Sequence, residues 1–173
     1  ESIQSCGNCE DCLRSNWTGC THRVELGIIG HDGGFAEYLA TSGRYVHKLP
    51  PELSLRRAAL CEPLAIILKG LNRLAQFWPT DPEIKRCAVV GGGSFGHLCA
   101  KVLSSRGHQV TVFDRDPKRR VYFQGTNIEV SGDLHDLYDF DVLAEVTGDP
   151  GVLDTLLLQS GPTATILLLD LPY

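Results

Sequence analysis

Residues 87–114, which read CAVVGGGSFGHLCAKVLSSRGHQVTVFD, carry the strongest structural signal in the chain. The stretch opens on an apolar run at 87–90, which is typical of a parallel strand buried on both faces. The residues that follow, from Gly91 to Gly96, fit the pattern G-x-G-x-x-G. A helical pattern then covers Ser94–Ser105, and an apolar run at Gln109–Phe113 predicts a second strand. The stretch therefore predicts a strand, a glycine-rich loop, a helix and a second strand in that order.

Each glycine of this motif has a distinct physical task in a loop that binds a dinucleotide. Gly91 permits a tight turn, Gly93 lets a pyrophosphate approach the backbone, and Gly96 allows close packing of helix against strand. Ser94 and Phe95 lie where the N-terminus of the helix faces the phosphates. The glycines alone would also fit a loop without a ligand. Their place between two strands and ahead of a terminal acid favours dinucleotide binding.

That acid is Asp114, 23 residues after Gly91, at the end of the second strand. An acid in this place accepts hydrogen bonds from the adenosine ribose hydroxyls of NAD. Arg115 follows it, and a short basic stretch at 118–120 could instead hold the 2'-phosphate of NADP. Because Asp114 would repel that phosphate, the sequence favours NAD over NADP and places Asp114 and Arg115 in the cofactor site.

Strands and helices continue to alternate after this unit. The pattern predicts a short helix at 117–124, a strand at 127–130, a strand at 141–146, a helix at 151–159 and a strand at 164–169. This alternation predicts a doubly wound parallel sheet of about five strands, with a ligand bound outside their carboxyl ends. Thr147 and Gly148 end one of these strands and are candidates for the nicotinamide side. A plain turn at the end of a strand is the other interpretation of the pair.

Four of the seven cysteines lie within the first twenty residues, namely Cys6, Cys9, Cys12 and Cys20. Their spacing, C-x2-C-x2-C-x7-C, is typical of a structural zinc site with four thiolate ligands. The first three also follow the spacing of an iron–sulfur cluster, but its fourth cysteine followed by proline is missing. A disulfide framework is a third alternative, favoured mainly in small secreted chains. A closed set of four ligands leaves no open position, so we expect a structural site.

The chain changes character near residue 52. Before it, the sequence is rich in glycine and polar residues, with strand-like runs at 35–40 and 45–49. After it, Ser54 predicts a helix start, and a longer helical pattern runs from Glu62 to about residue 77. We therefore expect two domains, one at 1–58 and one at 59–173.

Composition narrows the class of protein. The formal net charge of -5 argues against a nucleic-acid-binding surface, which would be basic. The apolar runs are far shorter than the roughly 20 residues that a membrane span needs. No secretory leader pattern is visible, so the sequence predicts a cytoplasmic protein with no nucleic-acid or membrane partner.

Four features together resemble a known family. They are the cysteine lobe, the segment GHDGGFAEYLATSGRYVHKLP at 30–50, the segment AALCEPLAIILKGLNRL at 58–74, and the G-x-G-x-x-G motif. In this order they resemble the zinc-dependent medium-chain alcohol and polyol dehydrogenases, in the branch similar to sorbitol, glucose and threonine dehydrogenases. The resemblance implies an α/β fold, in which a partial Rossmann-type sheet follows a zinc-stapled, loop-rich, β-containing remnant of a GroES-like catalytic domain.

The resemblance also implies roles for individual residues. Cys6, Cys9, Cys12 and Cys20 match the structural-zinc ligands, and Glu62 looks like the glutamate at the catalytic zinc. The implied reaction transfers hydride between a secondary alcohol or polyol and NAD, in a homo-oligomer such as a dimer or tetramer. Independently of the family, Glu62 also fits an acid in the first turn of a helix, where the helix dipole favours it.

The sequence departs from the family in its catalytic metal ligands. The family's further zinc-binding cysteine and its Gly-His-Glu histidine have no match, and Gly30-His31-Asp32 is the nearest imitation. We therefore expect this chain to be a central portion of a longer enzyme and to be inactive alone. The alternative is a non-catalytic module that binds zinc and NAD(H) and serves in redox sensing or assembly.

Overall fold

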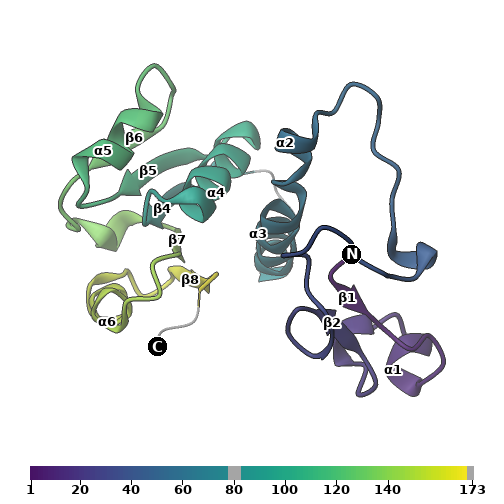
Figure 1. The fold of residues 1–173 in the computed structure, drawn as a ribbon. Helices are drawn as coiled ribbons and strands as arrows, with labels where there is room; N and C mark the ends of the chain where they lie inside the picture. Colours follow the sequence, from purple (N-terminus) through teal and green to yellow (C-terminus); the bar gives the residue numbers. More distant parts are fainter. Residues whose placement is uncertain (78–82, 171–173) are drawn as a thin grey trace. The chain divides into compact units, whose positions relative to one another are not determined.

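The computed structural model describes residues 1–77 and 83–170. It divides the chain into two compact units, Glu1–Ala58 and Ala59–Tyr173, here called the N-terminal and C-terminal units. Figure 1 shows the path of the chain through both.

The C-terminal unit alternates helices and strands. It begins with helix α3 (Cys61–Leu74), which a 3-10 turn at Ala75–Phe77 extends. Five strands follow, with three helices between them: β4 (Arg86–Val90), α4 (Ser94–Ser105), β5 (Gln109–Phe113), α5 (Pro117–Arg120), β6 (Glu129–Ser131), β7 (Val142–Glu145), α6 (Pro150–Gln159) and β8 (Thr165–Leu168). Two further 3-10 turns cover Val121–Phe123 and Leu137–Asp139.

The five strands form one parallel sheet in the order β6-β5-β4-β7-β8. The central strand β4 pairs with β5 on one side and β7 on the other, so Val89 lies between Val112 and Ala144. The chain therefore moves outward from β4 in one direction and then returns to continue in the other. This reversal creates a crevice at the carboxyl ends of β4 and β7, where α/β sheets bind ligands.

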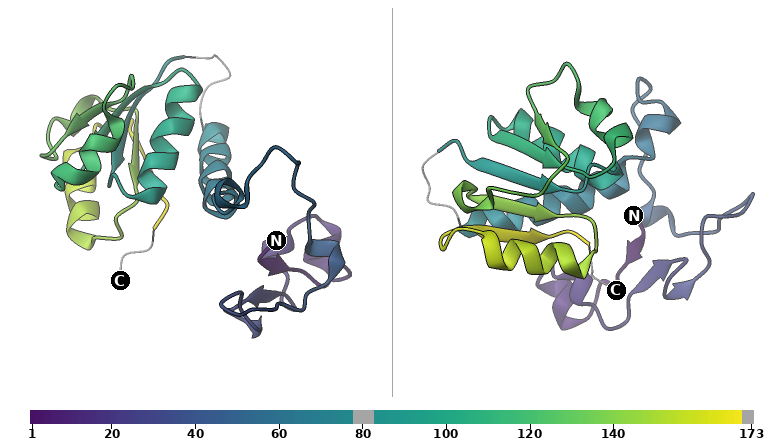
Figure 2. Two further views of the ribbon diagram at one scale, coloured as in Figure 1. Left: turned by 45° about the horizontal axis from the view of Figure 1, so that its top comes forward. Right: turned by 90° about the vertical axis from the view of Figure 1, so that its left-hand side faces the viewer.

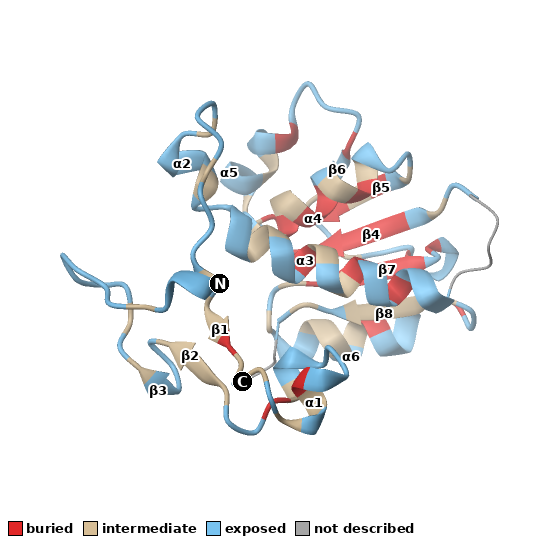
Figure 3. Cartoon of the chain, turned by 90° about the vertical axis from the view of Figure 1, so that its right-hand side faces the viewer, coloured by how far each residue is buried: buried red, intermediate tan, exposed pale blue. Residues whose placement is uncertain are grey.

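Alternate residues of β4 face two different apolar layers. Cys87 and Val89 pack with α3 and α4, whereas Ala88 and Val90 pack on the side of α6. Figure 2 shows these helices on the two sides of the sheet. Buried residues are concentrated on β4, β5 and β7 and on the helix faces turned toward them (Figure 3). Burial on both faces explains why these strands are continuous apolar runs.

Capping side chains define the starts of α5 and α6, and a glycine allows α3 to pack closely. Asp116 caps α5 by accepting from the Lys118 N–H at 2.9 Å, and Asp149 caps α6 by accepting from the Gly151 N–H at 2.9 Å. Gly70 brings α3 close to the chain just after β8, because a Cβ there would lie 2.7 Å from Leu169 Cδ2.

The N-terminal unit has little regular structure. Its strands are β1 (Ile3–Gln4), β2 (Val24–Leu26) and β3 (Gly30–His31), and its helices are α1 (Glu10–Leu13) and α2 (Leu55–Ala58). The 3-10 turns lie at Trp17–Gly19 and Gly43–Tyr45. β2 pairs antiparallel with β1 and parallel with β3. Only Gln4, Cys12 and Cys20 are buried among the described residues of this unit.

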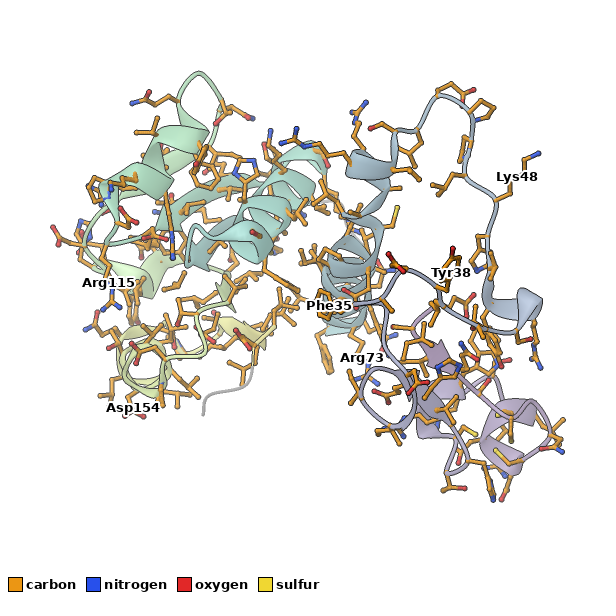
Figure 4. All side chains as sticks on the ribbon, in the orientation of Figure 1. Phe35, Tyr38, Lys48, Arg73, Arg115 and Asp154 are labelled. Carbon is orange, nitrogen blue, oxygen red and sulfur yellow. The ribbon has the colours of Figure 1, made fainter. Side chains whose placement is uncertain are left out.

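The structure confirms the α/β fold and the doubly wound parallel sheet, but the strands expected at 35–40 and 45–49 are wrong. The first segment has no regular structure, and a 3-10 turn occupies part of the second. Phe35 and Tyr38, labelled in Figure 4, are exposed. A strand needs a hydrogen-bonded partner as well as the right composition, and these segments pair with no strand among the described residues. No described helix is long and apolar enough to cross a bilayer.

Candidate functional site

A cleft of about 480 Å³ lies at the carboxyl ends of β4, β5 and β7. The glycine loop forms its middle, the segments after β5 and β6 form one wall, and the segment after β7 forms the other. The wall that follows β5 includes Asp114, Arg115 and Arg119. The wall that follows β7 includes Val146, Thr147 and Asp149. Figure 4 labels Arg115 on the first of these walls.

The three motif glycines meet three different surroundings. Gly91 has a φ of +107°, a conformation that side chains other than glycine rarely adopt. A Cβ on Gly96 would lie 1.7 Å from the Gly91 carbonyl oxygen, so only glycine lets α4 start so close to β4. A Cβ on Gly93 would meet no atom within 4 Å, although Gly93 lines the cleft. Open space at this position leaves room for a ligand to approach the backbone.

Ser94 and Phe95 begin α4 beside this opening, but neither belongs to the cleft wall. Ser94 is exposed, and Phe95 packs against the apolar layer of α3 and α4. The first N–H groups of a helix have no partner within the helix. At the N-terminus of α4, such groups and the helix dipole favour an anionic ligand.

Asp114 holds the glycine loop and faces a cation. Its buried carboxylate accepts from the Gly92 N–H at 2.6 Å and from the Asp116 N–H at 2.7 Å. The guanidinium of Arg119 lies 3.5 Å from the same carboxylate, and Arg120 donates to the Asp114 carbonyl oxygen at 2.7 Å. A carboxylate has about four acceptor positions, so these contacts leave capacity for a ribose hydroxyl.

A buried acid holds the turn that forms the opposite wall. Glu145 ends β7 and accepts from the Thr147 N–H at 2.6 Å, from the Thr147 hydroxyl at 2.5 Å and from the Gly148 N–H at 3.3 Å. Thr147 lines the cleft, while Gly148 has a φ of +68° and serves the turn without lining the cleft. Of Thr147 and Gly148, the two residues expected on the nicotinamide side, Thr147 therefore lies at the cleft and Gly148 does not.

The four N-terminal cysteines converge, and their sulfur atoms all lie within 4.8 Å of one another. The Sγ–Sγ distances are 3.4 Å for Cys9 and Cys12, 3.5 Å for Cys6 and Cys20, and 3.9 Å for Cys6 and Cys12. A tetrahedron with Zn–S bonds of about 2.3 Å has sulfur atoms about 3.8 Å apart. All four are free thiols, so the geometry fits one zinc ion.

The ionisation of these thiols also fits a metal site. The backbone N–H groups of Asn8 and Cys9 donate to the Cys6 sulfur and lower its pKa to about 6. The Cys12 N–H acts to lower the pKa of Cys9, but the Cys12 side chain and burial outweigh it and raise that pKa to about 12. Without a metal, Cys9 therefore keeps its proton and donates it to the sulfur of Cys12. A bound Zn²⁺ would displace that proton.

Each of the two units contains a match to a known family of protein domains. The alcohol dehydrogenase GroES-like domain family matches residues 1–51, and the NAD(P)-binding Rossmann-like domain family matches residues 89–138. D-altritol 5-dehydrogenase of Agrobacterium fabrum is 30% identical over 167 residues, which cover 92% of this chain and 49% of that protein. Glucose 1-dehydrogenase 1 of Caldivirga maquilingensis is 32% identical over 155 residues, which cover 86% of this chain and 44% of that protein.

The chain belongs to the zinc-dependent medium-chain alcohol and polyol dehydrogenases. It spans about half the length of the curated relatives it matches. Galactitol-1-phosphate dehydrogenase from Escherichia coli has the same fold over 98% of this chain and 51% of its own, with a TM-score of 0.81 and 23% identity.

Glu62 lies in the first turn of α3 and is exposed. Within residues 1–77 and 83–170 of this chain, the four cysteines are the one group of three or more ligand side chains close enough to hold a metal. The described residues therefore do not form a catalytic metal site around Glu62, and its role as a ligand stays a prediction. Its position agrees equally with an acid placed favourably at a helix N-terminus.

Two residues near the wall that follows β7 were not predicted from the sequence. Glu145 is buried at the end of an apolar strand, and Asp149 both lines the cleft and caps α6. A signal for Glu145 was available, because an acid inside an apolar strand must find donors when it is buried. Asp149 precedes Pro150, which is typical of a helix start.

Proposed function

We propose that this chain is part of an NAD-dependent, zinc-containing oxidoreductase that transfers hydride between a secondary alcohol or polyol and NAD. The observation that carries the nucleotide half is the cleft at the carboxyl ends of the strands, where Gly93 leaves open space beside the N-terminus of α4. Dinucleotides bind at this place in parallel α/β sheets.

Each wall of the cleft would hold a different part of the nucleotide. The N-terminus of α4 and the backbone at Gly93 would bind the pyrophosphate. Asp114 and Arg115 would bind the adenosine ribose side, and Thr147 would line the nicotinamide side. The nicotinamide, when bound, supplies the hydride acceptor, while these residues bind and orient it.

The alcohol half of the proposal is supported by the relatives, which are named as polyol and sugar dehydrogenases. In this proposal the substrate would be a small alcohol or polyol, Glu62 would ligate the catalytic zinc or its water, and the assembled enzyme would be a homo-oligomer. The Cys6, Cys9, Cys12 and Cys20 site would hold a structural zinc, because four thiolates close the coordination sphere. No observation favours the non-catalytic redox-sensing or assembly module over this proposal.

Gly93→Val tests the phosphate site with little effect on packing. A Cβ at this position meets no atom within 4 Å, so the melting temperature should fall only slightly, through the less favourable N-cap of α4. Because the new side chain blocks the approach of the pyrophosphate to the backbone, the Kd for NADH should rise about tenfold or more. Calorimetric titration with NADH and thermal melting measure the two effects.

Gly34→Val is the matched control, since Gly34 is exposed and a Cβ there also meets no atom within 4 Å. The control should leave the Kd for NADH unchanged. If Gly93→Val bound NADH as tightly as the unaltered chain, the cleft would not be the pyrophosphate site.

Asp114→Asn tests the preference for NAD. Removing the negative charge should reduce the ratio of NADH affinity to NADPH affinity roughly tenfold, because Arg115 and Arg119 line the same wall and Asp114 no longer repels a 2'-phosphate. The ratio is the measured quantity, since losing one acceptor for the Gly92 and Asp116 N–H groups weakens binding of both nucleotides. Tighter binding of NADPH than NADH by the unaltered chain would contradict the assignment of Asp114.

A further inference from the structure

Among the residues that the structure describes, Glu145 is the most deeply buried acid, with 1% of its surface exposed. It follows the apolar residues Leu143 and Ala144 in β7. Burying a carboxylate is costly unless hydrogen-bond donors surround it. An apolar residue at this position would avoid the free-energy cost of burying a charge, so the presence of a carboxylate is explained by the groups that it binds.

Glu145 holds the turn that follows β7. Two of its three donors are backbone N–H groups, those of Thr147 and Gly148, and the third is the Thr147 hydroxyl. The same hydroxyl accepts from the Asp149 N–H at 3.1 Å, and Asp149 in turn caps α6. One buried carboxylate thus sets the whole path from the end of the strand to the start of the next helix.

The turn also touches the glycine loop. A Cβ on Gly91 would lie 2.8 Å from Thr147 Cγ2 and 3.1 Å from Val146 Cγ2, so Thr147 and Val146 pack directly against Gly91. Thr147 and Asp149 both line the cleft, on the wall away from Asp114. The Asp114 carboxylate is held by Gly92, Asp116 and Arg119 and not by this turn, so a displacement of Thr147 would act first on the Thr147 wall of the cleft.

We propose that Glu145 is a positioning residue that fixes Thr147 at the nicotinamide wall of the cleft. The inference rests on the proposed function, because it takes the cleft as a dinucleotide site. A dinucleotide that spans the cleft depends on both walls, whereas ADP depends only on the glycine loop and the Asp114 wall. Glu145 therefore governs the affinity for the complete dinucleotide and not the affinity for its adenosine half.

Glu145→Gln is the first test, measured by calorimetric titration with NADH and with ADP. Glutamine has one acceptor oxygen, and its NH2 group would face an N–H or hydroxyl donor at the other position. The Kd for NADH should rise about tenfold, and the Kd for ADP should change less than twofold. Asp154→Asn, an exposed acid on α6 labelled in Figure 4, is the matched control and should change neither value.

Thr147→Val provides a second test that spares the buried acid. It keeps a methyl group against Gly91 but removes the hydroxyl that joins Glu145 to Asp149, so NADH binding should weaken while ADP binding persists. If Glu145→Gln folds poorly, this variant still decides the question. Equal losses of NADH and ADP affinity in a folded variant, or no loss of either, would overturn the role of Glu145. If the unaltered chain bound neither nucleotide, the proposed function itself would fail.

Discussion

Replacing Cys9 by serine is expected to remove the metal from the N-terminal unit and to unfold its sheet. The unaltered chain should contain about one zinc per molecule, because its four thiolates match one tetrahedral site. The variant should contain almost none, since a serine hydroxyl replaces one of four thiolate ligands. Residues 3–31, which contain β1, β2, β3 and all four ligands, should then lose their protection from hydrogen exchange.

The size of this effect follows from how little else holds the unit together. Cys12 and Cys20 are its only buried apolar residues in the described part of the chain, and both are members of the cysteine group. β1 and β3 are two residues long, so their hydrogen bonds alone cannot stabilise a sheet. Where a site does not exist in the unfolded chain, metal-binding free energy becomes folding free energy.

Cys61→Ser is the matched control, because Cys61 is exposed in α3 and lies outside the cysteine group. It should leave the zinc content and the exchange protection unchanged. Elemental analysis and hydrogen exchange followed by mass spectrometry measure both. Iron with acid-labile sulfide in the purified chain, or full protection of β2 in the metal-free Cys9→Ser variant, would contradict the zinc assignment.

Gly96→Ala should destabilise the C-terminal unit by about 3 kcal/mol, the upper range for an overpacked core. The added methyl group would lie 1.7 Å from the Gly91 carbonyl oxygen and 3.1 Å from Val146 Cγ2. Neither neighbour can move freely, because Gly91 carries the tight turn and its N–H donates to the Phe113 carbonyl oxygen at 2.8 Å. α4 would have to shift away from β4, which opens the apolar layer between α4 and the sheet.

Gly93→Ala is the comparison from the same motif, since its methyl group meets no atom within 4 Å. Chemical denaturation followed by far-ultraviolet circular dichroism should show a large loss of stability for Gly96→Ala and a much smaller one for Gly93→Ala, which changes only the N-cap of α4. Equal stability of the two variants would show that α4 does not pack on the Gly91 carbonyl as described.

The central strands and helices of the C-terminal unit could be predicted because their signals are local. The apolar run before Gly91 is β4, and the expected helix Ser94–Ser105 and strand Gln109–Phe113 have the same bounds in the structure. Burial on both faces requires a continuous apolar strand, and a helix between parallel strands requires an apolar stripe. β6 is less certain from sequence, expected at 127–130 and found at Glu129–Ser131, because a short strand at the edge carries a weak pattern.

The N-terminal unit was predicted less well. The cysteine spacing predicted a group that the structure brings together within 4.8 Å. The strand-like runs at 35–40 and 45–49 are not strands, while β2 and β3 arose from segments with no strong signal. Metal ligands dictate this unit more than apolar periodicity does, so composition was a poor guide to its strands.

The order of the elements, the glycine loop and the ligand set of the metal site could be predicted from the sequence, because each depends on residues close together in the chain. The construction of the cleft walls could not, because it depends on contacts between distant segments. Glu145 forms hydrogen bonds with Thr147 and Gly148, which are its near neighbours in the chain. The position of this turn against Gly91, however, depends on the pairing of β4 with β7, two strands that lie more than fifty residues apart in the sequence. Likewise, Asp114 reaches Gly92 only because β4 and β5 lie side by side in parallel. Contacts between distant segments follow from the order of the strands in the sheet, which depends on how elements far apart in the chain pack together.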